Sequence, residues 1–335
     1  MRLTIEKIIN NAYGLAHYNG KVVLTPYTAD GDVVDVTVVE DKKNLTFAKL
    51  DRVVTPSEFR IEPICKYYTI CGGCDMLHIR EEHEVNVKKE WLKYDFKRDV
   101  ELITGEFLHY RSRARFSSND GTQAFKKRLS NESVEVENCP LLSGDVNKNT
   151  FMVGDKQFTI DESVFFQANR EIAHKIAMYI KGNIKGTSIY DFYGGVGFFS
   201  SFLEDDYNDI TVIEENKNAK KFAYINLKKS RFIASSTENA TKYLKVKADT
   251  SIVDPPRVGM TPKAIKAVTT LTKSRVIYVS CDYKTQLRDI KEFEKYGFEL
   301  DSVVAFNMFP RTHHLETVCI LSKLNAKQHI GLTLI

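Results

Sequence analysis

The sequence predicts an α/β protein in which a small all-β barrel precedes a larger, doubly wound sheet of parallel strands. Two patterns support this fold class. Residues 1–54 alternate short apolar runs with turn-forming residues, whereas residues 168–321 alternate apolar strands with helical segments. The length of 335 residues also favours about two or three domains over a single one.

The composition limits the class of protein. Apolar residues make up 43% of the chain and charged residues 27%, which excludes a disordered or collagen-like protein. The longest apolar runs are far too short to span a membrane, and residues 1–10 contain no continuous apolar stretch of the signal-peptide type. We therefore expect a cytoplasmic monomer that does not bind membranes.

Residues 1–54 are expected to form the barrel. Their short β-branched runs are separated by turn formers such as Asn19-Gly20 and Asp30-Gly31. Acidic and basic residues balance at eight each through residue 60, so charge alone gives no indication of RNA binding here. Proline and polar residues over 55–63 are typical of a linker.

The central part, residues 55–160, combines a helix with a basic segment. Apolar spacing predicts an amphipathic helix over 81–98, which can pack on the domain that follows. Between residues 86 and 128, eleven basic residues outnumber six acidic ones. Arg111, Arg113 and Arg115 recur at period two, so a strand over 110–116 would place them on one face, either to bind phosphates or simply to be solvated.

Three of the six cysteines lie within ten residues of one another. These are Cys65, Cys71 and Cys74, and their crowding is typical of metal ligands rather than of disulfides in a reducing compartment. Cys319 lies in the middle of an apolar strand and is expected to be buried.

From residue 161 onward, alternation of helices and strands predicts the doubly wound sheet. Helices are expected over 168–182, 197–204 and 216–230, and strands over 187–191, 209–214, 251–254, 275–280 and 317–321.

Polar residues follow several of these strands. A glycine-rich turn, residues 191–197, starts at Asp191, and Glu214 ends the next strand, where its carboxylate suits the two hydroxyls of a ribose. This turn favours a nucleoside-type cofactor, with a structural turn as the alternative. Asp254, before two prolines, and Cys281 end later strands at the same sheet edge, and Glu316 begins the last strand, where it suits a general base.

The motifs together resemble those of the RNA uridine-5-methyltransferases, which make 5-methyluridine with S-adenosyl-L-methionine. The matching motifs are Cys-x5-Cys-Gly-Gly-Cys, Phe-Phe-Gln, Asp-x-Tyr-Gly-Gly-Val-Gly, Asp-Pro-Pro-Arg, Ser-Cys-Asp and Met-Phe-Pro-x-Thr-x-His-x-Glu. The resemblance implies an RNA-binding TRAM barrel of OB type at 1–54, a small central iron–sulfur domain at 55–160 and a Rossmann-like methyltransferase domain at 161–335. Two positions depart from the family pattern: Phe198, often Asn, and Asn307, commonly Asp.

The resemblance also implies roles for individual residues. Cys281 would attack carbon 6 of uracil, and Glu316 would remove the proton from carbon 5. Asp254 would hold the uracil edge or orient the cofactor. The implied cofactor-binding residues are Gln167, Tyr193, Gly195, Glu214, Asp254 and, at the adenine, Asn239 or Glu238.

The four cysteines Cys65, Cys71, Cys74 and Cys139 would bind a [4Fe–4S] cluster, with a tetrahedral zinc site as the alternative. A stacked uracil cannot reach Cys281, so the enzyme must flip its base or choose a loop. Basic residues 126–128 would meet phosphates. The other residues expected to contact RNA are Phe165, Phe166, Arg111, Arg113, Arg115 and Arg257.

Three functions are compatible with this pattern. The first is methylation of a uridine in 23S ribosomal RNA, with a T-loop uridine of transfer RNA close behind. The second is an iron–sulfur RNA-binding protein whose methyltransferase fold is inactive, and the third is an oxidoreductase that uses the cluster for electron transfer.

Overall fold

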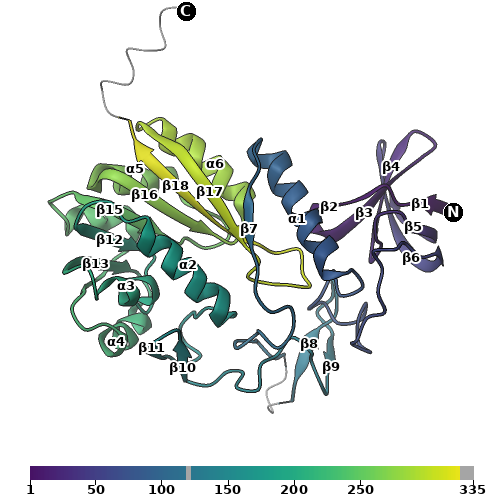
Figure 1. Cartoon of the computed structure of the whole chain (residues 1–335), viewed down its shortest axis with the longest axis horizontal. Coiled ribbons are helices and arrows are strands. Elements are labelled where there is room, and N and C mark those ends of the chain that lie inside the picture. Colours follow the sequence, from purple (N-terminus) through teal and green to yellow (C-terminus); the bar gives the residue numbers. More distant parts are fainter. Residues whose placement is uncertain (118–121, 325–335) are drawn as a thin grey trace, which may run out of the picture.

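The computed structural model describes residues 1–117 and 122–324. Figure 1 shows a β-rich unit at one end, a large sheet with helices at the other, and helix α1 (Glu81–Phe96) between them. No helix in the described ranges combines the length and apolar character that crossing a membrane requires.

The first six strands form one sheet that surrounds its own core. Alternate residues point inward, and the buried side chains come from five of the six strands and the β1–β2 connection. Asn19 and Gly20 both have positive φ angles, as expected for a two-residue hairpin turn. The strands, in the sheet order β1-β5-β6-β4-β3-β2, are β1 (Arg2–Thr4), β5 (Val33–Asp41), β6 (Leu45–Thr55), β4 (Lys21–Pro26), β3 (Tyr13–Tyr18) and β2 (Lys7–Ile9), and a 3₁₀ turn, η1, covers Asn10–Ala12.

The central segment has little regular structure of its own. Helix α1 packs on both neighbours, because Trp91 donates to the carbonyl of Ile8 in the barrel at 3.0 Å while Leu92 and Phe96 enter the core of the large sheet. The remaining elements are the strand β7 (Glu101–Ile103), the hairpin β8 (Ala124–Lys126) and β9 (Ser133–Glu135), and the hairpin β10 (Thr150–Val153) and β11 (Lys156–Thr159).

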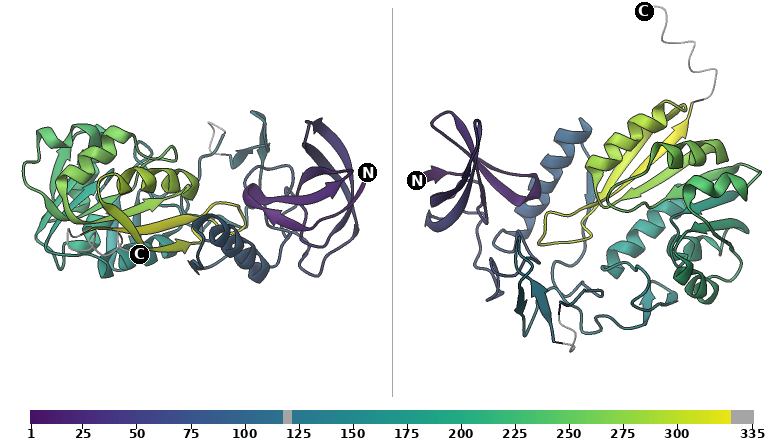
Figure 2. Two further views of the ribbon diagram at one scale, coloured as in Figure 1. Left: turned by 90° about the horizontal axis from the view of Figure 1, so that it is seen from above. Right: turned by 180° about the vertical axis from the view of Figure 1, so that it is seen from behind.

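The large sheet contains eight strands and carries helices on both faces (Figure 2). Apolar side chains of α5, α6 and α1 form one core cluster, and those of α2, α3 and α4 form the other. The helices are α2 (Arg170–Gly182), α3 (Phe198–Leu203), α4 (Lys217–Asn226), α5 (Pro262–Leu271) and α6 (Tyr283–Glu294), with a 3₁₀ turn, η2, over Thr237–Lys242. The strands, in sheet order, are β14 (Arg231–Ala234), β13 (Asp209–Glu214), β12 (Ser188–Phe192), β15 (Ala248–Val253), β16 (Thr272–Ser280), β18 (Glu316–Lys323), β17 (Phe298–Phe306) and β7.

The sheet differs from the expected all-parallel arrangement at β18. This strand runs antiparallel to both β16 and β17. The reason is local: β17 and β18 follow one another through residues 307–315 without a crossover helix, and such neighbours pair antiparallel.

The predicted strand over 110–116 is wrong. In the structure, Arg111 makes two isolated bridges, to Leu142 and Asn169, and Ser112 donates its N–H to the carbonyl of Ala168 at 2.7 Å. The segment is extended between loops instead of belonging to a sheet, so the three arginines do not share a strand face.

Candidate active site

The largest cavity lies at the carboxyl ends of the parallel strands, where the β8–β9 hairpin faces the sheet. Its volume is about 1130 Å³. Parallel strands bring their carboxyl ends to one edge, so residues far apart in sequence converge there. The sequence-predicted residues that line this cavity are Gln167, Tyr193, Gly195, Glu214, Asp254, Arg257, Cys281, Glu316, Phe165, Arg111, Arg115 and the basic residues Lys126, Lys127 and Arg128.

Cys281 and Glu316 lie opposite each other at this edge. Ser280, the last residue of β16, pairs with Thr317 of the antiparallel strand β18. The next pair outward in the same register is Cys281 and Glu316, one residue beyond β16 and at the start of β18. Because β18 runs antiparallel to β16, its first residue lies beside the end of β16. The strand direction therefore brings the Glu316 carboxyl to the Cys281 thiol.

Carboxyl groups dominate the electrostatics around the thiol. Burial, together with the carboxyls of Glu316 and Asp254, raises the pKa of Cys281 to about 12, and the guanidinium of Arg257 opposes this increase. Burial also raises the pKa of Glu316 well above its ordinary value, and that of Asp254 to about 7. In the free chain, the thiol of Cys281 therefore holds its proton at neutral pH.

Arg257 is the cation placed to favour the ionised thiol. Its guanidinium donates to Nδ1 of His314 at 2.7 Å. Burial, together with the charges of His313 and Arg257, lowers the pKa of His314 to about 3, so this imidazole is neutral and can accept the bond. The arrangement leaves the charge of Arg257 available to the cavity.

The glycine-rich turn after β12 forms a second wall of the cavity. A Cβ at Gly194 would come within 2.6 Å of the side chain of Val212, so only glycine fits there. The N–H of Gly195 donates to Oε2 of Glu214 at 3.0 Å, and the N–H of Asn216 donates to Oε1 at 2.6 Å. These bonds fix the Glu214 carboxylate at the cavity wall, where its remaining lone pairs can accept from hydroxyl groups.

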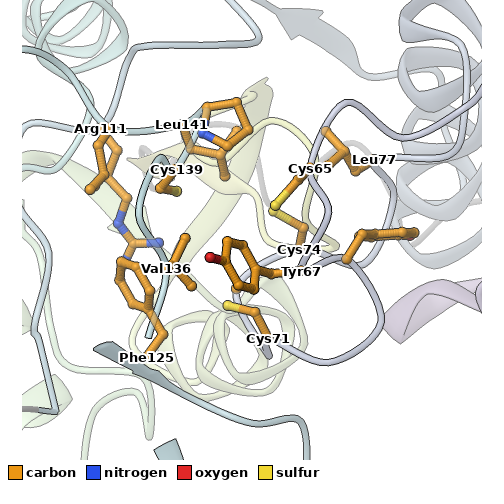
Figure 3. Close-up of a pocket in the computed structure, with 14 residues that line it drawn as sticks. Cys65, Tyr67, Cys71, Cys74, Leu77, Arg111, Phe125, Val136, Cys139 and Leu141 are labelled. Carbon is orange, nitrogen blue, oxygen red and sulfur yellow. The ribbon is translucent and has the colours of Figure 1, made fainter. Parts of the chain in front are cut away.

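The four clustered cysteines line one separate pocket. Figure 3 shows Cys65, Cys71, Cys74 and Cys139 around a common space, with Tyr67 and Arg111 beside them. All six cysteines of the chain, which fall within the described ranges, carry free thiols. Among the described residues, no three of the His, Cys, Asp and Glu side chains form a group that could hold one metal ion.

Comparisons with known proteins identify the family. The family described as tRNA (Uracil-5-)-methyltransferase matches residues 237–324, and the tRNA (uracil(54)-C(5))-methyltransferase TRAM domain matches residues 1–59. The chain is therefore similar to the RNA uracil-5-methyltransferases at both its N-terminal and its C-terminal parts. Members of this family are enzymes, and the match at 1–59 means that the β-rich unit at the N-terminus is a TRAM domain.

Similar uracil-5-methyltransferases and RNA methyltransferases align over nearly the whole chain. An uncharacterized RNA methyltransferase of Treponema denticola is 28% identical over 91% of this chain and 94% of that protein. A tRNA (uracil(54)-C(5))-methyltransferase of Pyrococcus abyssi is 24% identical over 96% of this chain and 100% of that protein. The crystal structure of the P. abyssi enzyme, in complex with S-adenosyl-L-homocysteine, has the same fold, with a TM-score of 0.77 and 22% identity over 96% of this chain and 99% of that one.

Three sequence-predicted residues of the methyltransferase lie elsewhere than expected. Phe166 is only 4% exposed and stacks on Phe151 with ring centroids 5.7 Å apart, so it is a core residue and not a platform for a base. Asn239 donates to Oγ of Ser236 at 2.9 Å and does not line the cavity. Arg113 donates to the carbonyl of Asp161 at 3.1 Å and is also absent from the lining.

Their sequence neighbours lie at the pockets instead. Phe165 is 75% exposed and lines the large cavity. Glu238 lines a smaller pocket beside Tyr193 and Glu214, and accepts a bond from Oγ1 of Thr261 at 2.9 Å. Glu238 is thus the better candidate at the adenine.

Several residues of the cavity wall were not predicted, among them Asp75 and Leu129. Asp75 follows Cys74, and Leu129 follows the basic residues 126–128. No sequence signal could have found Asp75, because its partner His313 lies 238 positions further along the chain. The sequence shows that Leu129 is an apolar residue directly after three basic ones. Only the structure shows that it is exposed and that it lines the cavity.

Proposed function

We propose that this chain transfers a methyl group from S-adenosyl-L-methionine to carbon 5 of a uridine in RNA through a covalent bond to Cys281. The observation that carries the proposal is the register of β16 and β18, which faces Cys281 with Glu316 in the cavity that also contains the glycine-rich turn. A nucleophile and a carboxyl that lie on neighbouring strands and line the same cavity suit addition to a pyrimidine ring followed by proton removal.

The proposed reaction begins when the Cys281 thiol gives its proton to solvent in the cavity and the thiolate sulfur bonds to carbon 6. The electron pair of the carbon 5–carbon 6 double bond moves toward carbon 5 and the neighbouring carbonyl, which makes carbon 5 nucleophilic. Carbon 5 then takes the methyl group of S-adenosyl-L-methionine; the bond between the methyl carbon and the sulfonium sulfur breaks, and S-adenosyl-L-homocysteine leaves with that electron pair. Glu316, as a carboxylate, takes the proton from carbon 5, the sulfur–carbon 6 bond breaks, and the thiolate is released. Arg257 stabilises the thiolate in the first and the last step of the reaction, since it is the cation that lowers the pKa of Cys281.

The cofactor is proposed to lie along the glycine-rich turn. Gln167, Tyr193, Gly195 and Asp254 line the same space, and Glu214 is oriented by two backbone N–H groups. A carboxylate held in this way suits a ribose, and Glu238 replaces Asn239 as the proposed neighbour of the adenine.

A fluorinated substrate tests the chemistry directly. RNA with 5-fluorouridine at the target should form an adduct with the chain that survives denaturation, because fluorine cannot leave carbon 5 as a proton does. The adduct should map to Cys281 by peptide mass spectrometry. If labelled cofactor binds but no adduct forms, the inactive RNA-binding protein becomes the better proposal.

The proposed RNA is a T-loop uridine of transfer RNA, ahead of the 23S ribosomal RNA that the motifs favoured. The similar proteins with named substrates are tRNA (uracil(54)-C(5))-methyltransferases, and the matched TRAM domain carries the same description. Mass spectrometry of nucleosides from separated transfer and ribosomal RNA, in a deletion strain and its parent, would decide between them. Loss of 5-methyluridine from ribosomal RNA alone would reverse the order.

We also propose that the cysteine pocket binds a [4Fe–4S] cluster, with a structural role. Four thiols around one space support the proposal. A cluster bonds four thiolates through four separate irons, and a tetrahedral zinc site with the same four thiols is the alternative. Iron and sulfide analysis of anaerobically purified protein is the test; stoichiometric zinc without iron would overturn it.

A further inference from the structure

The hairpin formed by β8 and β9 carries an exposed leucine at its turn. Leu129 is 92% exposed, more than any other exposed large apolar side chain in the described residues, and it lines the same cavity as Cys281. A side chain this exposed buries little apolar surface and therefore contributes little to the free energy of folding. Single exposed apolar residues are common on protein surfaces, so it is the position of Leu129 in the lining of the cavity, together with its backbone, that points to contact with a partner.

The backbone at Leu129 is equally unusual. Ser130 donates its N–H to the carbonyl of Lys127 at 3.3 Å, so Leu129 is the third residue of a turn, and its φ is +53°. Turns place glycine or asparagine at such positions, because a side chain like that of leucine is disfavoured there. Neither packing nor turn geometry explains the leucine, and strained residues gather at functional sites.

The residue before it is held firmly. The N–H of Arg128 donates to the carbonyl of Ile70 at 3.3 Å, and its guanidinium pairs with Asp75. The guanidinium also lies over the rings of Tyr27 and Tyr13 of the barrel, at 4.9 and 5.7 Å from their centroids.

Residues 65–74, which carry Cys65, Cys71 and Cys74 and are called the cysteine loop here, pack against the hairpin. Gly72 donates its N–H to the carbonyl of Lys126 at 2.9 Å, and a Cβ at Gly72 would come within 3.1 Å of that oxygen. The loop and the hairpin therefore touch backbone to backbone. Only the turn, with Leu129, projects from this support.

We propose that Leu129 is a wedge that enters the base stack of the RNA and fills the space left when the target uridine turns out toward Cys281. This inference rests on the proposed function. An enzyme must remove a stacked base from its stack to react with it, and proteins that open a stack insert apolar side chains between bases. Arg115 and Lys126 line the cavity beside Leu129, where they can meet the phosphates on either side of the opened step.

The variant Leu129→Asn tests the wedge without endangering the fold. Asparagine adopts positive φ more easily than leucine, so the turn is kept while the apolar side chain is lost. The matched control is Val246→Asn, which alters another exposed apolar residue, 70% exposed and away from the cavity lining.

The probe is a synthetic T-arm stem-loop with 2-aminopurine next to the target uridine. Wild-type chain should raise the 2-aminopurine emission on binding, because the base step opens, and Leu129→Asn should raise it far less. The rate of methylation of an unstructured single-stranded RNA, divided by that of the stem-loop, should rise by about tenfold in Leu129→Asn and stay constant in Val246→Asn.

The outcomes separate the wedge from the proposed reaction. Equal emission changes for wild type and Leu129→Asn, or a rate ratio that does not move, would overturn the wedge. A wild-type chain that binds the stem-loop without raising the emission would overturn it too. If the wild type raises the emission but transfers no methyl group to either RNA, the proposed function fails while the wedge stands.

Discussion

Cys281 is a nucleophile in surroundings that hold it protonated. Burial, together with the carboxyls of Glu316 and Asp254, raises its pKa to about 12, and the guanidinium of Arg257 acts to lower it. The thiol is therefore unreactive in the free chain, and its reactivity must depend on what else enters the cavity. Keeping the thiolate scarce until the substrate is bound would protect a partly exposed cysteine from unwanted reactions.

Replacing the nucleophile should separate chemistry from binding. Cys281→Ala is expected to lower the rate of methylation by about 10³-fold or more, because carbon 5 cannot become nucleophilic without the addition. Affinity for S-adenosyl-L-methionine, measured by calorimetry, should stay within about twofold, since the thiol is not one of the residues that line the pocket of the glycine-rich turn. The control is Cys319→Ala, a buried cysteine of β18. A Cys281→Ala variant with substantial turnover would remove the nucleophile from the proposal.

The two charged neighbours of the thiol should shift its titration in opposite directions. Glu316 raises the pKa of Cys281 and Arg257 lowers it. Alkylation of Cys281 by iodoacetamide, followed by peptide mass spectrometry across pH, should therefore move to lower pH in Glu316→Gln and to higher pH in Arg257→Gln, because only the thiolate reacts. Shifts in the same direction for both variants would contradict the charge arrangement.

The ionised form of Asp254 is expected to destabilise the folded chain, because its carboxylate is buried. Its pKa is raised to about 7, above the value of about 3.9 in an unfolded chain. The folded state then binds the proton more tightly, so stability declines as pH rises from about 4 to 7. Asp254→Asn should raise the free energy of unfolding at pH 8 by about 1–2 kcal/mol and change it little at pH 4. Urea denaturation at the two pH values checks this, and an equal effect at both would refute the buried-charge explanation.

Residue identities were predicted best where a motif lies at a strand end. Cys281 and Glu214 could be placed from the sequence because parallel strands bring their carboxyl ends to one edge whatever the side chains do, whereas Glu316 reaches that edge only because β18 runs antiparallel. Phe166 and Asn239 could not, because one residue along an irregular segment reverses which side chain faces the cavity. Phe165, and not Phe166, lines the large cavity, and Glu238, and not Asn239, lines the smaller pocket beside Tyr193.

At the scale of elements, helix α1 holds the loop that leads to Glu316. Lys88 is fully buried and donates to Glu84 on its own helix at 2.7 Å and to Oδ1 of Asn307 at 2.8 Å. The backbone N–H of Arg311 donates to the carboxylate of Glu84 at 3.0 Å. The loop over 307–315 is therefore tied to a helix of the central segment at its first residue and at its middle.

Breaking the buried pair on α1 should be costly only when one partner remains charged. Lys88→Met removes the nearer of the two cations beside the buried Glu84 carboxylate and leaves only Arg311, at 3.6 Å, so it is expected to lower the free energy of unfolding by about 3–5 kcal/mol. Adding Glu84→Gln should restore a large part of that loss, so the two changes will not be additive. A denaturant double-mutant cycle measures this. Strictly additive effects would mean that Lys88 contributes through packing alone.

The elements themselves were predictable where periodicity was strong. The expected helix at 81–98 is observed as α1, and the expected strand at 209–214 is β13. The error at 110–116 arose because period-two arginines describe an extended backbone equally well inside a sheet or between loops. The direction of β18 depends on the missing crossover helix, which becomes visible only once β17 is recognised as a strand.

In the whole molecule, the three parts of the chain meet at Asp75. Its carboxylate accepts from Nδ1 of His313 at 2.6 Å and pairs with Arg128, which in turn lies over Tyr27 of the barrel. Barrel, cysteine loop and the loop before Glu316 are thus joined through one carboxylate. Domain bounds at 54 and 160 remain predictions, although the hairpin β10–β11 shares the core cluster of α3.

Asp75→Asn should therefore impair catalysis on every RNA. Burial acts to raise the pKa of Asp75, but the bond from His313 and the charge of Arg128 outweigh it and hold the pKa below its ordinary value. The ionised carboxylate stabilises the fold above the unfolded pKa of about 3.9, and this contribution is lost as pH falls through the folded pKa. The variant should lower the free energy of unfolding at pH 7 by about 1–3 kcal/mol, with a smaller difference near pH 4.

Its effect on turnover distinguishes this link from the wedge. Because Asp75 holds the loop before Glu316, Asp75→Asn should lower kcat on single-stranded and stem-loop RNA alike, whereas Leu129→Asn changes the ratio between them. Asp155→Asn, an exposed carboxylate in the β10–β11 turn, is the matched control. If Asp75→Asn lost stability but kept its full kcat on both RNAs, the carboxylate would join the three parts of the chain without positioning the catalytic loop.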